Sequence, residues 1–295
     1  MARRLQWPQD GAGWPGAGHA RLLDAGGVRW FVRRQGQGPV VLLLHGTGAS
    51  SHSWRGLLPR LQSRFDLVAV DLPGHGFSSL PSSSAMTLPG IAAALGALLG
   101  RLGAEPALLV GHSAGVAVAL RLCLDGRAAP TAVLGFNAAL LPWAGAAGQL
   151  FAPLARLLAA APGVPGLFAW RAASPAALQR LIDGTGSRLD AEGIACYARL
   201  VRNPGHVEGA LAMMARWDLL ALWRDLPRLR VPLTLVVAGG DRTVPPAQAD
   251  EVLRRWPPGV PVRRIDWPRL GHLAHEERPD RAAEAVLDVA RPCLA

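Results

Sequence analysis

The sequence predicts an α/β fold built on a mostly parallel sheet, with a helical insertion late in the chain. Short apolar runs alternate with helical patterns over the first 137 residues. Residues 138–228 then show helical patterns without a convincing strand, and the strand signal returns at 233–237. With 295 residues, half of them hydrophobic, the chain is long enough to bury one large core.

The individual elements follow from apolar patterning and turn signals. Residues 40–44 and 233–237 are continuous apolar runs, which are typical of buried parallel strands. Residues 260–265 are more polar and fit an edge strand. The expected strands are 19–24, 28–34, 40–44, 67–70, 107–110, 131–136, 233–237 and 260–265, and the expected core helices are 54–61, 91–102, 116–124 and 282–290. The insertion follows the sixth strand and predicts a core of 1–137 and 229–295 with a helical lid of 138–228.

Residues 128–155 carry no charged side chain, which raises the alternative of a membrane span. Three prolines (Pro130, Pro142 and Pro153) favour a core strand followed by an apolar lid segment, so we expect no transmembrane helix. The first residues lack an apolar signal core, and three widely spaced cysteines form no C-x-x-C pair. We therefore expect a cytoplasmic protein in a reducing compartment.

The formal net charge is +10, and all 31 basic residues are arginine. The arginines are scattered and form no basic run, which favours a compositional bias over a binding surface. Nucleic acid is not expected as a partner, because no basic stripe is interleaved with aromatic residues. Peripheral contact with an anionic membrane surface stays open.

Residues 111–115, Gly-His-Ser-Ala-Gly, match the G-x-S-x-G nucleophile elbow. An apolar strand precedes the motif and an apolar helix follows it. In that context the glycines leave room for a sharp turn that exposes the serine hydroxyl. The pattern predicts Ser113 as a nucleophile.

A serine nucleophile needs a base, and the base needs a carboxylate that fixes its tautomer. In this topology the acid and the histidine follow the serine in that order. Asp241 comes directly after the apolar run 233–237, where ligands bind in open sheets. His272 follows Gly271 in a later loop and is the expected base. The spacing to His275 offers no third ligand, so neither a metal nor a cofactor is expected.

An oxyanion needs two backbone donors. We expect them to be the N–H of Ala114, after the nucleophile, and that of Thr47, in the loop His45-Gly46-Thr47-Gly48. His45 is expected to buttress that loop. His112 is expected either to line the pocket or to pack under the elbow. Further side chains expected at a pocket for a small apolar ester-like substrate are Trp54, Phe151, Trp170, Met213 and Met214.

Together these motifs resemble the α/β-hydrolase superfamily from about residue 19 onward. The resemblance rests on the loop at 45–48, Asp71-Leu-Pro-Gly-His-Gly, the elbow, Gly240-Asp241 with Val244-Pro245, and Gly271-His272 with Glu277 and Pro279. It implies hydrolysis of an ester-like bond. Serine at the nucleophile position disfavours the dehalogenase and epoxide-hydrolase branches, whereas carbon–carbon hydrolases and haloperoxidase-like members share this triad.

A narrower resemblance is to the magnesium-chelatase accessory proteins of bacteriochlorophyll biosynthesis. Several of its supporting stretches lie in the expected lid, including residues 185–190 and 205–218. It implies a tetrapyrrole substrate and contact with magnesium-chelatase subunits, but it supplies no reaction. A binding or accessory protein for the chelatase, with hydrolysis absent or incidental, is therefore the alternative to a serine hydrolase.

Overall fold

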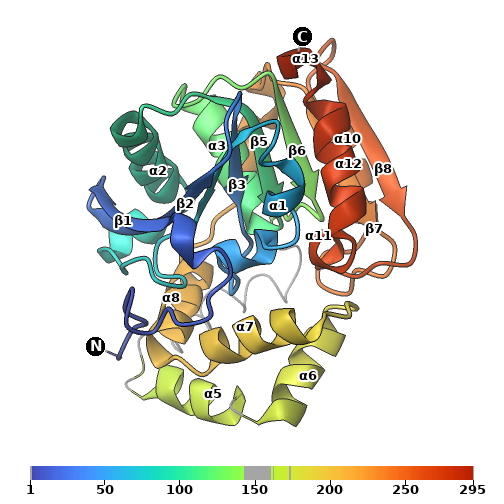
Figure 1. Cartoon of the computed structure of the whole chain (residues 1–295). Coiled ribbons are helices and arrows are strands. Elements are labelled where there is room, and N and C mark those ends of the chain that lie inside the picture. The colour runs from blue at the N-terminus through green and yellow to red at the C-terminus, as the bar shows by residue number, and fades with distance from the viewer. Residues whose placement is uncertain (1, 143–160, 162, 173, 295) are drawn as a thin grey trace.

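The computed structural model describes residues 2–142, 161, 163–172 and 174–294, and it is organised around one eight-stranded sheet (Figure 1). The strand order is β1-β2-β4-β3-β5-β6-β7-β8. The strands are β1 (Ala20–Ala25), β2 (Val28–Gln35), β3 (Val40–Leu44), β4 (Asp66–Val70), β5 (Pro106–His112), β6 (Ala132–Phe136), β7 (Leu233–Ala238) and β8 (Val262–Trp267). β2 pairs antiparallel with β1 and β4, and the other pairs are parallel. The mostly parallel sheet is therefore confirmed, with β8 at its edge.

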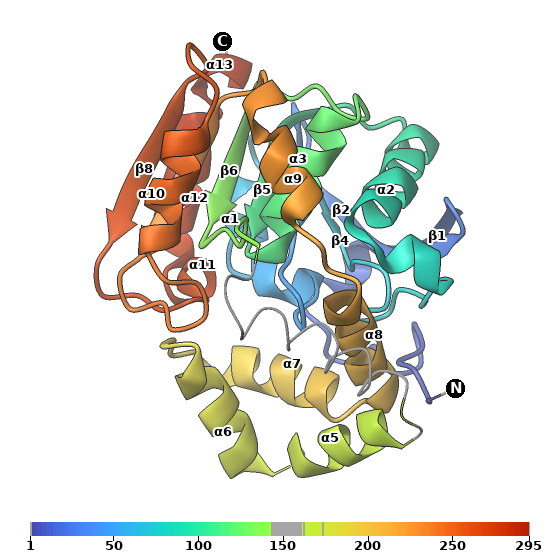
Figure 2. The ribbon, with the colours of Figure 1, turned by 180° about the vertical axis from the view of Figure 1, so that it is seen from behind.

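Helices cover both faces of this sheet, and apolar side chains on each face form a core. One face carries α2 (Leu88–Leu102), α3 (Ala114–Leu124), α9 (Leu220–Asp225) and α10 (Ala247–Arg255), which Figure 2 shows from behind. The other face carries α1 (Leu58–Leu61) and α12 (Pro279–Val289). The expected helix 54–61 is instead a 3-10 turn, η2 (Ser51–Trp54), followed by the short α1, and α10 was not expected at all.

Between β6 and β7 the chain forms a layer of helices beyond one end of the sheet (Figure 1). These are α5 (Val164–Ala172), α6 (Pro175–Gly184), α7 (Ala191–Val201) and α8 (Pro204–Ala215). We call α5–α8 and their connections the lid. The expected division at 228 also places α9 in the lid, but α9 packs beside α3, and Leu222 and Leu226 join the core under the sheet.

The N-terminal segment ties the lid to the core. Arg4 donates to the carbonyl of Gly205 at the start of α8 and to that of Gly74 in a core loop, both at 2.6 Å. At the same junction α8 lies so close that a Cβ added to Gly209 would stand 1.8 Å from the Gly74 carbonyl oxygen. The lid and core are thus packed backbone against backbone.

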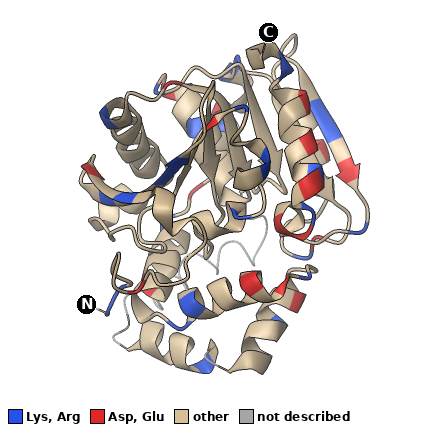
Figure 3. Ribbon diagram, viewed as in Figure 1, with Lys and Arg blue, Asp and Glu red and all other residues tan. Residues whose placement is uncertain are grey.

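Two further features bear on the expectations from composition. In Figure 3 the basic residues lie on many elements, as the sequence predicted, rather than along one stripe. Within the described ranges, none of the helices combines the length and the apolar character that crossing a bilayer requires.

Candidate active site

The elbow between β5 and α3 has the strained backbone that the motif predicts. Ser113 has φ 51° and ψ −119°, outside the regions that non-glycine residues favour. The flanking glycines make this possible, since a Cβ on Gly115 would stand 2.1 Å from the carbonyl oxygen of Leu44, and one on Gly111 would stand 2.6 Å from the nitrogen of Val116. Any larger side chain at position 111 or 115 would therefore clash with the backbone around the turn that carries Ser113.

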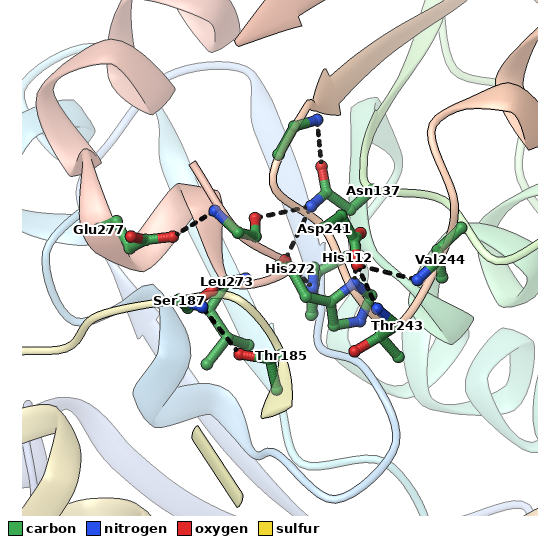
Figure 4. A network of polar contacts seen from close by, with 12 residues as sticks. His112, Asn137, Thr185, Ser187, Asp241, Thr243, Val244, His272, Leu273 and Glu277 are labelled. Carbon is green, nitrogen blue, oxygen red and sulfur yellow. Dashed lines mark hydrogen bonds and ion pairs between the residues drawn. The ribbon is translucent and has the colours of Figure 1, made fainter. Parts of the chain in front are cut away.

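Asp241 and His272 meet in the loops after β7 and β8. His272 Nδ1 lies 2.7 Å from Asp241 Oδ2, and both side chains are buried. The other oxygen, Asp241 Oδ1, accepts from the backbone N–H groups of Thr243 at 2.7 Å and Val244 at 2.8 Å (Figure 4). Because a carboxylate only accepts, Nδ1 carries the proton and Nε2 of neutral His272 is left as an acceptor.

The loop of His272 is joined to the elbow through His112 and Asn137. His112 Nε2 donates to the carbonyl of His272 at 2.9 Å, and the two imidazole rings lie 4.7 Å apart. Asn137, which follows β6 with φ 48°, donates to the carbonyls of Gly271 at 2.9 Å and His272 at 3.1 Å (Figure 4). His112, which directly precedes Ser113, thus links the elbow to the loop that carries His272.

The loop after β3 lies against the elbow. A Cβ on Gly46, the residue before Thr47, would stand 3.0 Å from Ser113 Cβ. Ala114 opens α3, so its N–H has no acceptor within the helix. The assignment of the Thr47 and Ala114 N–H groups as oxyanion donors stays a prediction.

Two buried histidines fix the shape of this loop, which we call the Gly46–Gly48 loop. His45 Nε2 accepts from Leu72 N–H at 2.8 Å, so its Nδ1–H donates to the Gly46 carbonyl at 2.7 Å. His206, from α8, accepts from Gly76 N–H and donates to the Gly48 carbonyl at 3.1 Å. Burial lowers the pKa of both imidazoles, that of His206 to about 3, and keeps them neutral. The buttressing role expected for His45 matches these contacts.

The expected pocket residues divide into three groups. Met213 is buried with its sulfur 3.6 Å from Thr47 Oγ1, and Met214 beside it is half-buried. Phe151 lies outside the described residues. Of the two alternatives for His112, the structure has packing: the side chain is buried, with its ring 4.4 Å from that of His275.

For two of the residues expected to contact substrate, the burial of the side chain does not support that role. Trp54 is fully buried in the core, with its ring 4.7 Å from that of His275, because η2 turns back against the sheet. Trp170 is 73% exposed, because α5 buries Pro165 and Ala169 and turns the tryptophan outward.

Sequence reasoning assigned no role to four residues that hold the His272 loop, namely Asn137, Thr185, Ser187 and Glu277, although Glu277 and the stretch 185–190 belong to the motifs quoted for the two resemblances. Gly271 N–H donates to Glu277 Oε1 at 2.8 Å, His272 N–H to the Thr185 carbonyl at 3.0 Å, and Leu273 N–H to Ser187 Oγ at 2.8 Å (Figure 4). The sequence signal that could have pointed to these residues is the presence of Gly186 and Gly271, because their backbones pack against each other in the structure.

Comparison with known proteins shows the family to which this chain is related. Residues 41–285 match the model of the alpha/beta hydrolase family. The chain is 42% identical to a magnesium-chelatase 30 kDa subunit from Rhodobacter capsulatus, over 94% of this chain and 96% of that protein. It is 31% identical to a pimeloyl-[acyl-carrier protein] methyl ester esterase from Methylococcus capsulatus, over 85% and 95% of the two chains.

Among solved structures, an alpha/beta hydrolase fold protein from Burkholderia ambifaria superposes with a TM-score of 0.75 at 21% identity, covering 98% of this chain and 100% of the other. That likeness supports the fold alone. The family match and the extended identity to relatives confirm both resemblances found in the sequence. The chain belongs to the alpha/beta hydrolase family.

Proposed function

We propose that the protein is a serine hydrolase that cleaves an ester-like bond on an apolar substrate. The observation that carries the proposal is the contact of His272 Nδ1 with Asp241 Oδ2 at 2.7 Å, in a loop joined to the strained elbow of Ser113. A serine, a histidine acceptor and an oriented carboxylate in this arrangement are the components of nucleophilic acyl transfer.

In the proposed reaction, Ser113 Oγ attacks the carbonyl carbon and its proton passes to His272 Nε2. Asp241 holds the imidazole and stabilises the imidazolium. The N–H groups of Thr47 and Ala114 bind the oxyanion of the tetrahedral intermediate. The same proton then goes to the leaving alcohol as its bond to the acyl carbon breaks, which leaves an acyl group on Ser113 Oγ. His272 next takes a proton from water, the hydroxide attacks the acyl carbon, and His272 returns that proton to Ser113 Oγ as the acid leaves.

Covalent labelling with a serine-reactive probe tests whether Ser113 is an activated nucleophile. A fluorophosphonate probe should add one equivalent to the wild-type chain, as measured by intact mass, and none to Ser113→Ala. Ser53→Ala is the matched control, because Ser53 is also buried and its hydroxyl has no hydrogen-bond partner among the described residues. Equal labelling of wild type and Ser113→Ala would contradict the proposal.

For the substrate we propose a tetrapyrrole that carries an ester or carboxylate, supplied in the neighbourhood of magnesium chelatase. The support is the 42% identity to a relative named as a magnesium-chelatase subunit, which extends over 94% of the chain. We propose a cytoplasmic site of action, with chelatase subunits as candidate partners. A screen of porphyrin esters and free magnesium porphyrins tests this, and the absence of both turnover and binding would reject it.

The same relative favours a second candidate, an accessory protein that binds a porphyrin for the chelatase without hydrolysing it. Complementation separates the two candidates. In a bacteriochlorophyll-producing strain that lacks this protein, Ser113→Ala should fail to restore pigment if hydrolysis is the function. Full restoration by the same variant would favour the accessory protein.

A further inference from the structure

The peptide groups around His272 are held from two sides. On one side, three successive N–H groups, those of Gly271, His272 and Leu273, each donate to an acceptor outside their own turn. Two of those acceptors, the Thr185 carbonyl and Ser187 Oγ, lie in the lid between α6 and α7 (Figure 4). On the other side, the carbonyls of Gly271 and His272 accept from Asn137, and that of His272 also from His112. The lid therefore holds N–H groups while the core holds the carbonyls.

The lid residues 185–188 also reach the loop of Asp241. The Thr185 carbonyl that accepts from His272 accepts from Arg242 N–H as well, at 3.3 Å. A Cβ on Gly186 would stand 2.1 Å from the Gly240 carbonyl oxygen, and one on Gly271 would stand 2.3 Å from the carbonyl carbon of Gly186. One short lid segment is thus wedged between the loops that carry the acid and the base.

Glu277 closes the arrangement from the core. Its Oε1 accepts from Gly271 N–H at 2.8 Å, and its Oε2 accepts from Arg188 N–H in the lid at 3.1 Å. Ser187 is 1% exposed, so water does not replace its hydroxyl while the lid is docked. A buried N–H that loses its acceptor costs free energy unless the backbone moves, and movement here displaces the imidazole.

We propose that lid residues 185–188 are a positioning element for His272, with Ser187 and Glu277 as positioning residues. The base is aligned on Asp241 only while this segment is docked, so the lid takes part in assembling the site. The proposal rests on the proposed function, because it assigns His272 as the base.

The test compares two lid serines. Ser187→Ala removes the acceptor of Leu273 N–H, whereas Ser174→Ala removes an equivalent bond, the cap to Ala177 N–H at 3.1 Å, away from the triad. We expect Ser187→Ala to lower the maximal rate of Ser113 phosphonylation by about tenfold to 100-fold with little change in half-saturating probe concentration. Ser174→Ala should stay within twofold of wild type. Equal rates for both variants would overturn the proposal.

A second readout does not depend on hydrolysis. The Nδ1 proton of His272, shared with Asp241, should give a low-field proton NMR resonance that is absent from His272→Gln. Ser187→Ala should shift or broaden it, and Ser174→Ala should leave it unchanged. If the wild type fails to label, the proposed function fails and this resonance alone decides the positioning role. A resonance unaffected by Ser187→Ala, or missing from the wild type, would overturn the proposal.

Glu277→Gln provides a second variant should Ser187→Ala fail to fold. In the wild type the two carboxylate oxygens accept from the N–H groups of Gly271 and Arg188. The glutamine amide has only one oxygen, and its NH2 group cannot accept, so one of these two hydrogen bonds is lost. Glu284→Gln, on the exposed face of α12, is its control. We expect the same loss of rate and the same change in the resonance for Glu277→Gln alone, and no difference between the two variants would overturn the proposal.

Discussion

The loops that carry the proposed nucleophile and the proposed base are built in opposite ways. The elbow of Ser113 is a local structure, in which a strand and a helix meet over two glycines within five residues. The loop of His272 has no such local frame, and residues as distant in sequence as His112, Asn137, Thr185 and Ser187 hold it. The position of Ser113 is therefore set by the fold of a few consecutive residues, whereas the position of His272 depends on how the lid packs against the core. Changes at the elbow should therefore damage folding, and changes around the base should damage chemistry first.

The largest expected effect is on rate without a loss of fold. In Asp241→Asn the amide oxygen must stay on the N–H groups of Thr243 and Val244, so the amide NH2 faces His272 Nδ1. This forces the proton to Nε2 and removes the acceptor for the serine proton. We expect labelling of Ser113 to slow by about 10³–10⁴-fold. The denaturation midpoint of Asp241→Asn checks that the variant is folded. The labelling rate of Asp24→Asn, a substitution in an exposed hairpin, is the control. A loss below about tenfold would contradict the assigned tautomer.

Gly115→Ala should break the elbow and the fold together. The added methyl group would stand 2.1 Å from the Leu44 carbonyl oxygen, a backbone atom of the central strand β3. Overpacking of this kind should cost about 3 kcal/mol or more of unfolding free energy, measured by chemical denaturation. Gly100→Ala is the matched control, because its Cβ meets nothing within 4 Å on α2 and should stabilise by about 1 kcal/mol. Stability equal to wild type for Gly115→Ala would show that β3 yields at this contact.

The smallest effect per group concerns protons. Burial is the main cause of a lowered pKa at six histidines, namely His45, His52, His75, His112, His206 and His275. Below about pH 6.5 these histidines bind a proton in the unfolded chain but stay neutral in the folded chain. Each of them should therefore lower the free energy of unfolding by about 1.4 kcal/mol for every pH unit below that value. Asp71 and Glu276 oppose this, because burial raises their pKa values to about 6 and about 7 and the folded chain takes up those protons first. With six groups against two, stability should fall between pH 6.5 and pH 5.

His275→Phe isolates one of these protons. Both ring nitrogens of His275 lack hydrogen-bond partners among the described residues, and the ring packs against Trp54 and Phe136. We expect the variant to be at least as stable as wild type and to lose about one proton from the pH dependence of unfolding. An unchanged slope between pH 6.5 and pH 5, measured by urea denaturation, would mean that His275 is protonated in the fold.

The contrast between the two loops also explains how much could be predicted from the sequence. Ser113, Asp241 and His272 follow from strand-loop patterns that each span a few residues, and in the structure they come after β5, β7 and β8 of the same sheet. The sequence did not predict that Trp54 lies in the core and that Trp170 is exposed, because apolar character alone does not say whether a side chain faces a cavity, the core or solvent. Asn137 and Ser187 carry no local pattern that reveals their partners, since those partners lie 134 and 86 residues away.

The docking of the lid on the His272 loop has a consequence for hydrogen exchange. Amide hydrogens leave for solvent only when their bonds open, and those of residues 271–273 bond to Glu277, Thr185 and Ser187 rather than within a helix or strand. Two of them are released only when the lid segment lifts. Their deuterium uptake therefore reports how often the lid lifts from the core, independently of any substrate or probe.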